Sequence, residues 1–129
     1  MVFVNFTVAE ILKRKKFKDL CIAHYMIDAD ESPNIIFNLQ SYMANYSMLY
    51  SCNSSTLRFN NNTCDAPTIS QTLTWILKNY NIIITPWYEE KYKQWTYLIN
   101  QKRLNSTILY NSKEEAELNG IEFVLKNII

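Results

Sequence analysis

Three segments of the chain carry the same signal for the start of a helix. Each has Ser or Thr followed three residues later by Glu or Gln, and each precedes an apolar run: Thr7 to Glu10, Thr68 to Gln71 and Ser112 to Glu115. In this capping-box pattern the hydroxyl accepts from the amide of the third helical residue, whose side chain bonds back to the capping residue's amide. The pattern predicts helices over residues 8–16, 69–80 and 113–128.

Helical spacing of the apolar residues predicts the buried face of each helix. The predicted buried positions are Val8, Ile11 and Leu12; Ile69, Leu73, Ile76, Leu77 and Tyr80; and Ala116, Gly120, Phe123, Val124 and Ile128, flanked by Leu118, Ile121 and Leu125. By the same spacing Trp75 lies nearly opposite the second stripe. An outward tryptophan is either covered by another segment or part of a contact surface, and we expect cover from residues 20–28 or the middle segment.

The only glycine of the sequence, Gly120, falls in the middle of the third predicted helix. A glycine at such a position costs about 0.5–1 kcal/mol relative to alanine. The missing Cβ would let this helix cross close to its neighbour. We therefore expect Gly120 to mark a close approach to the sheet or to the second helix.

Strand signals lie between the predicted helices. Residues 20–28 form one half-buried strand, and the β-rich runs 81–88, 94–101 and 106–110, separated by polar turns, predict an antiparallel meander. Pro86 should place the first of these runs on a sheet edge or end its regular pairing. Residues 31–66 are irregular, with a hairpin predicted from the runs 46–52 and 55–59.

The predicted fold class is α+β, in one domain over residues 1–129. Its order is α-β-(hairpin or irregular)-α-β-β-β-α, with an antiparallel sheet of three or more strands and the helices on one face. An N-terminal helix–strand unit spans residues 1–30, the irregular segment residues 31–66, and an αβββα unit residues 67–129.

Composition excludes several classes of function. The net charge of +1 over 129 residues argues against a strongly basic nucleic-acid surface. No apolar run approaches the length of a membrane span, and the N-terminus does not have the order of a secretory signal, so we expect no membrane association and no signal-directed secretion. The three cysteines lack zinc-site spacing, and a disulfide between Cys52 and Cys64 is left open.

Catalytic chemistry has few candidate residues. His24 is the only histidine, and on an extended strand it points away from the face of Cys21, three residues earlier. We interpret it as a structural, hydrogen-bonded histidine. The run Asp28 to Glu31 lacks the glycine and terminal glutamate of a calcium loop and is interpreted as a solvated acidic turn. The sequence predicts no catalytic residue, cofactor or metal site.

Candidate binding residues fall into two groups. The basic run Lys13, Arg14, Lys15 and Lys16 could contact an acidic partner, although basic residues also suit a helix C-terminus, which is the favoured interpretation. The aromatic candidates are Trp75, Trp87, Tyr88, Trp95 and Tyr97. On the predicted strands some of these rings fill the core, and the remainder are free to form a surface for a protein or a stacked base.

Two resemblances add to these interpretations. The order α-β-β-β-α ending in "SKEEAELNGIEFVLKNI" resembles the double-stranded-RNA-binding domain. That family's phosphate-gripping basic motif is matched only by Lys113 and Ala116, and glutamates stand at 114, 115 and 117, so the RNA function does not carry over.

The segments "CIAHY", "APTISQTLTWILKNYNIIITP", "QWTYLIN" and "YNSKEEAELNGIEFVLKNI" together resemble small uncharacterised proteins encoded by bacteriophages and mobile elements of gut anaerobes. This resemblance runs from about Thr7 to the end of the chain. It implies a phage or prophage setting and supplies no activity.

These interpretations together predict a non-catalytic phage- or prophage-encoded protein that binds another protein, in the host cytoplasm or the virion. Whether it does so as an oligomer or a virion component is left open. The alternative is a phage accessory factor that binds a nucleotide or nucleic acid, for instance to counter host defence. An uncharacterised hydrolase ranks third, because no acid–base pair or metal cluster can be assembled from these residues.

Overall fold

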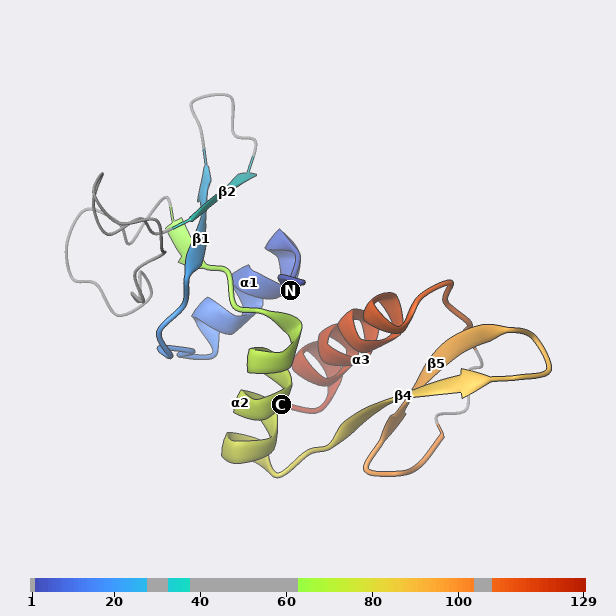
Figure 1. The fold of residues 1–129 in the computed structure, drawn as a ribbon. Helices are drawn as coiled ribbons and strands as arrows, with labels where there is room; N and C mark the ends of the chain where they lie inside the picture. The colour runs from blue at the N-terminus through green and yellow to red at the C-terminus, as the bar shows by residue number, and fades with distance from the viewer. Residues whose placement is uncertain (1, 28–32, 38–62, 104–107) are drawn as a thin grey trace. The chain divides into compact units, whose positions relative to one another are not determined.

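The computed structural model describes residues 2–27, 33–37, 63–103 and 108–129. Along the chain its elements are α1 (Phe6–Arg14), β1 (Ala23–Ile27), β2 (Pro33–Phe37), β3 (Thr63–Asp65), α2 (Ile69–Tyr80), β4 (Ile84–Glu89), β5 (Gln94–Ile99) and α3 (Lys113–Asn127) (Figure 1). This combination of helices and antiparallel sheets confirms the α+β class. The chain divides into two compact units, Phe3–Pro67 and Met1–Val2 with Thr68–Ile129.

The first unit contains a three-stranded antiparallel sheet in the order β2-β1-β3, and α1 packs against β3. In the centre of the sheet Tyr25 lies opposite Ile35 on one side and Cys64 on the other. The Tyr25 hydroxyl donates to the Val4 carbonyl at 2.7 Å, and burial, with Cys64 as a smaller contribution, raises the pKa of this tyrosine. β2 and β3 correct the expectation that residues 31–66 are irregular apart from a hairpin at 46–59; that hairpin lies outside the described residues.

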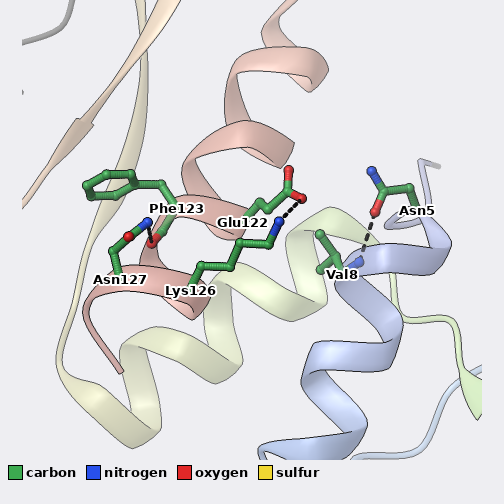
Figure 2. Close-up of polar contacts among 6 residues, drawn as sticks. All are labelled: Asn5, Val8, Glu122, Phe123, Lys126 and Asn127. Carbon is green, nitrogen blue, oxygen red and sulfur yellow. Dashed lines mark hydrogen bonds and ion pairs between the residues drawn. The ribbon is translucent and has the colours of Figure 1, made fainter.

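The first helix begins earlier than the capping-box pattern predicts. Asn5, not Thr7, is the N-cap: its side-chain oxygen accepts from the Val8 amide at 2.9 Å (Figure 2). Asparagine is as good an N-cap as serine or aspartate, so two cap signals competed here and the upstream one prevails.

The basic run ends this helix. Lys16 adopts a left-handed backbone with φ of 70°, its amide donates to the Lys13 carbonyl, and the Phe17 amide donates to the Leu12 carbonyl. This pair of bonds is a Schellman C-terminal motif, and the buried side chains of Phe17 and Leu12 supply the apolar contact that accompanies it.

In the second unit α3 packs against both strands of the β4–β5 hairpin, and α2 packs against α3. The predicted third strand, 106–110, is reduced in its described part to one bridge between Tyr110 and Trp95, whose amides each donate to the other's carbonyl. Within the described residues the predicted αβββα unit is therefore αββα, which also removes one strand from the double-stranded-RNA-binding outline.

α2 has the predicted bounds, and Thr68 caps it by accepting from the Gln71 amide at 3.1 Å. Its predicted buried face is confirmed only in part, at Ile69 and Ile76. Leu77 and Tyr80 are exposed, whereas Thr72 and Trp75 are buried. The Thr72 hydroxyl donates to the Thr68 carbonyl at 2.9 Å, so this polar side chain is buried at little cost and the buried face shifts toward it.

α3 also starts where predicted, with Ser112 accepting from the Glu115 amide at 3.1 Å. Figure 2 shows two contacts of its last turns: the Glu122–Lys126 ion pair at 2.9 Å, and the Asn127 side-chain amide donating to the Phe123 carbonyl at 3.0 Å. Ile128, predicted to face the core, is exposed because it lies just beyond the helix.

Gly120 marks the close approach that the sequence predicts. A Cβ built on it would lie 2.8 Å from the Ile84 Cγ2 of β4 and 3.0 Å from the Tyr97 Cγ of β5. Both atoms are attached close to their own backbones, so relieving the clash requires a change of rotamer in the packed core or a shift of a strand. The missing Cβ therefore sets how closely α3 lies on the hairpin.

Gly120→Ala should destabilise the protein even though alanine favours helix. Overpacking costs typically 1–3 kcal/mol, which exceeds the gain in helix propensity of about 0.5–1 kcal/mol. Asn119→Ala is the matched control, because it gains helix propensity at the adjacent position, where the side chain is half-exposed. Urea unfolding monitored by circular dichroism measures both. A Gly120→Ala protein as stable as Asn119→Ala would refute this packing role.

β4 forms one edge of the two-stranded sheet, as Pro86 predicts. Trp95 makes its backbone bonds to Tyr110, so the opposed pair Tyr88–Trp95 is a pair without mutual backbone bonds. By alternation Pro86 stands at the same kind of position, and its nitrogen points to the outer edge of β4. Proline has no N–H, so it removes a donor from the middle of that edge.

Pro86→Val should restore this donor and promote edge-to-edge pairing between molecules. In size-exclusion chromatography with light scattering, we expect the apparent mass of Pro86→Val to rise with protein concentration more than that of wild type. Thr85→Val is the control, because by alternation its backbone groups face β5 instead. Equal behaviour of the two variants would show that Pro86 does not protect the edge.

Candidate functional site

The four hairpin aromatics predicted as binding residues divide between the two faces of the sheet. Opposed residues share a face, so Tyr88, Trp95 and Tyr97 lie on the α3 side and Trp87, opposite Thr96, lies on the other. The face alone does not separate core rings from surface rings, because Tyr88 on the α3 side is exposed.

Tyr97 belongs to the core of the unit. Its ring stacks on that of Tyr110 at 6.3 Å between centroids and packs at the same distance, tilted, against Phe123 of α3. Burial raises the pKa of Tyr97, with Tyr110 as a second cause, and burial also raises the pKa of Tyr110. These two half-buried phenols contribute to the packing of the hairpin against α3.

The distal half of the hairpin carries the exposed rings. Tyr88 and Trp95 make an edge-to-face contact at 5.2 Å, as expected for a pair without mutual backbone bonds, whose side chains lie closer together. Tyr88 is 44% exposed, Trp87 48%, and Tyr92 in the connecting turn 55%. Figure 1 shows this turn lying clear of α3. We call Trp87, Tyr88, Tyr92 and Trp95 the aromatic hairpin surface; Tyr92 was not among the residues predicted from the sequence.

The charged side chains around this surface make contacts within the hairpin region. Arg103 forms an ion pair with Glu89, and the Lys91 ammonium lies 5.4 Å from the centroid of the Tyr92 ring. Glu90 and Lys93 are exposed in the turn. The rim of the surface is therefore polar and of mixed sign.

Trp75 is not part of this surface. It is only 7% exposed, and its ring packs edge-to-face against that of Tyr80 at 5.5 Å. Trp75 is covered, as expected, but it lies on the buried face of α2 and not opposite to it, because that face is turned toward Thr72. Its indole is a core side chain of α2.

The basic run is likewise structural in part. The Lys13 ammonium donates to the Thr63 carbonyl of β3 at 2.6 Å, and Lys15 is half-buried. Arg14 and Lys16 are exposed at this helix end, where the Lys16 amide makes one of the two bonds of the Schellman motif. These placements agree with the interpretation favoured from the sequence, in which the run supplies cations at a helix C-terminus.

A groove of about 410 Å³ lies in the second unit beside the first turns of α2 and α3. Apolar side chains and charged ones share its lining: Val2, Thr68, Ile69, Ser70, Leu73, Lys113, Glu114 and Glu117. The Ile69 amide donates to the Val2 carbonyl at 2.8 Å, which fixes the N-terminal segment along α2. No sequence signal singled out this groove.

Glu117 is the most perturbed charge of the groove. Burial raises the pKa of its carboxyl, Lys113 lowers it in part, and Glu114 raises it. Lys113 stands one helical turn before Glu117, at the spacing of an ion pair on the same face of a helix. The charged form of Glu117 is thus incompletely compensated in the folded chain.

The described residues form no cluster of potential metal ligands. Among them no three His, Cys, Asp or Glu side chains are grouped to hold a metal ion. His24 lies on β1 between Ile36 and Asp65. The run 28–31 and Cys52, whose disulfide with Cys64 the sequence leaves open, fall outside the described residues.

No known protein family, curated protein or solved structure matches this chain. In the described part of the chain, no helix is both long enough and apolar enough to cross a membrane.

Glu117→Gln should stabilise the protein at neutral pH. Folding raises the pKa of Glu117 from 4.5, so the protonated carboxyl is the form that favours the folded state. Its contribution to the free energy of unfolding is complete below pH 4.5 and is lost as the pH rises through the folded-state pKa. Glutamine keeps the shape without the charge, so the variant should have a higher free energy of unfolding than wild type at neutral pH and an equal one under acid conditions. Glu122→Gln, which breaks the pair with Lys126, should not stabilise the protein. Denaturant titrations across pH measure this, and a pH-independent difference for Glu117→Gln would contradict it.

Proposed function

We propose that this protein is a non-catalytic binding protein that docks onto a protein partner through its aromatic hairpin surface. The observation that carries the proposal is the exposure of Trp87, Tyr88 and Tyr92 on one hairpin held by α3. Tyrosine and tryptophan are enriched at interfaces because they supply large contact areas with a polar handle and lose little side-chain entropy.

The contact uses side chains and not the sheet edge. Pro86 weakens the outer edge of β4 as a template for an added strand. The rings lie on both faces and at the tip of the hairpin, so a partner with a concave surface would contact them together. Each half-exposed ring offers a contact area on the order of 100 Å². The three rings would form the centre of an interface, and the polar rim would supply the rest of the roughly 800 Å² that each partner of a standard interface buries.

The charges favour a protein over a nucleic acid. Neutralising phosphates requires lysine and arginine side chains that face outward. Here Arg103 is paired with Glu89, Lys91 lies near the Tyr92 ring, and Glu90 and Lys93 add charges of opposite sign to the turn. Charges of both signs at the edge of exposed aromatic rings are typical of the polar rim of a protein interface.

The resemblance to phage and mobile-element proteins supports a phage or prophage setting for this function. In that setting the partner is a host protein, a phage protein or a second copy of the chain, and the protein acts in the host cytoplasm or as a virion component. The nucleotide- or nucleic-acid-binding accessory factor is the competing proposal.

Replacing exposed rings should abolish binding without unfolding the protein. We expect Tyr88→Ser with Tyr92→Ser to weaken the partner complex, or the wild-type self-association, by about 30-fold or more, the loss typical of interface hot spots. Ile128→Ser, at an exposed apolar position outside the hairpin, is the matched control and should bind like wild type.

The measurement pairs light scattering over a concentration series with crosslinking from a photoreactive residue at position 88 in infected or lysogenic cells. A crosslinked protein partner, or a defined oligomer, that depends on the hairpin rings is the expected result. A wild-type monomer that crosslinks to nothing would overturn the proposal. Co-purified absorbance at 260 nm that the ring substitutions remove would establish the competing proposal instead.

A further inference from the structure

The outer edge of β2 lacks the protection that the other described sheet edges have. α1 packs against β3, whose residues are all buried, and the Lys13 ammonium bonds to the Thr63 carbonyl. Pro86 removes a donor from the edge of β4, and Tyr110 pairs with the outer edge of β5. β2, by contrast, is exposed along its whole length and carries no charged side chain. Proteins cover, charge or interrupt strand edges to prevent pairing with another chain, so among the described strands β2 is the one left able to accept a further strand.

The pairing of β1 shows which groups of β2 face outward. The Ala23 carbonyl accepts a bond on the β3 side, so the next residue, His24, bonds to Ile36 of β2 instead. The alternate residues of β2, Ile35 and Phe37, therefore point their N–H and C=O groups to the outer edge. Neither makes a hydrogen bond to a described residue on that side. Each offers one donor and one acceptor to an added strand.

The side chains along this edge are apolar and suited to a strand. Ile35 is 39% exposed, Ile36 37% and Phe37 47%. The Phe37 ring is positioned by an edge-to-face contact with Phe3, at 5.5 Å between centroids. Isoleucine and phenylalanine favour strands, and a run without charge does not repel an identical run. The edge is therefore complementary to a copy of itself.

We propose that β2 pairs antiparallel with β2 of a second copy of the chain, about a two-fold axis at Ile35. This is the register that overlaps all five residues of both strands. The two Ile35 amides donate to each other's carbonyls, and each Phe37 amide donates to the Pro33 carbonyl of the other copy. On one face the two Ile35 side chains meet, flanked by Phe37 opposite Pro33 at both ends.

A second copy fits this edge better than a foreign strand does. Strand addition from another protein gains its specificity from pockets for alternate side chains, whereas a two-fold contact needs only a self-complementary patch. The groove described above does not serve β2, because its lining residues belong to the other unit. Pairing joins two three-stranded sheets into one six-stranded sheet, a common size for proteins.

The size of the contact sets its strength. The exposed parts of the three apolar side chains amount to on the order of 300 Å² per copy, less than half of the roughly 800 Å² that each partner of a standard interface buries. We therefore expect a weak dimer that forms as the protein concentration rises, and the two-fold contact closes at two copies. The inference does not depend on the proposed function, because β2 and the aromatic hairpin surface share no residue.

Charged residues at position 35 test both the pairing and its register. Ile35→Lys and Ile35→Glu each place like charges opposite each other, so each should weaken dimerisation at least about tenfold in sedimentation equilibrium. An equal mixture of the two variants should dimerise again, because lysine then lies opposite glutamate. This recovery also shows that both variants are folded. Leu20→Lys, at an exposed apolar position of the same unit outside the sheet, is the matched control and should dimerise like wild type.

Amide hydrogen exchange locates the contact in the wild-type chain. Raising the protein concentration should protect the outward-facing amides of Ile35 and Phe37 from exchange. The amide of Ile36, which already bonds to β1, should change little. Protection confined to other residues would place the contact elsewhere and contradict the proposal.

Four further results would overturn the assignment. One is a wild-type chain that stays monomeric up to its highest soluble concentration, and another is association that grows beyond two copies. A dimer lost in Tyr88→Ser with Tyr92→Ser but kept in both position-35 variants would assign self-association to the hairpin. A photoreactive residue at position 35 that crosslinks in cells only to a different protein would assign the edge to a foreign strand. None of these results would by itself remove the hairpin as a binding surface.

Discussion

The contact of Gly120 with Ile84 and Tyr97 decides how the second unit is built. A two-stranded hairpin is marginally stable alone in water, so β4 and β5 need another element to bury one of their faces. α3 does this from very short range, with no side chain at its closest point. The cost of a mid-helix glycine is offset by the burial that this approach allows.

The same contact separates core aromatics from surface aromatics. α3 reaches the proximal half of the hairpin, where the ring of Tyr97 packs against Phe123 and stacks on the ring of Tyr110. Tyr88 lies on the same face as Tyr97 but two positions further along the pairing with β5, and it remains exposed. The division therefore follows from the placement of α3 along the hairpin and not from the residue types, which are alike.

Local signals predicted much of this architecture. The bounds of α2 and the start of α3 follow from Thr68 and Ser112, because a cap satisfies its own helix irrespective of what packs on it. Gly120 was interpretable for a similar reason, since a glycine inside a helix lowers stability unless a neighbouring backbone or side chain needs the space of its missing Cβ. Pro86 marked the edge strand because its missing N–H excludes a central position.

The misses concern interactions that residue type does not encode. Thr72 was assigned no place in the core because it is polar, yet its hydroxyl bonds to the Thr68 carbonyl and the buried face of α2 turns with it. The same shift of the buried face brings Trp75, which the predicted stripe placed on the opposite side, into the core. β3 has only three residues, too few for a periodic pattern, and β2 is exposed throughout, so neither presents the alternation that identifies a strand. The groove depends on two helix starts far apart in the chain and had no local signature.

The exposed rings at the hairpin tip call for a physical reason, because serine or lysine at positions 87, 88 and 92 would serve an isolated hairpin turn equally well and would remove apolar surface from water. Single exposed apolar residues are ordinary on proteins, but neighbouring rings on one projecting element are a liability for aggregation. Pro86 suppresses the pairing of β4 edges, one route to that aggregation, and leaves the rings accessible. The chain therefore protects the strand edge and keeps the aromatic side chains exposed, which separates unwanted edge pairing from the proposed side-chain contact. This separation is the strongest physical argument for the proposal that the hairpin tip is a binding surface.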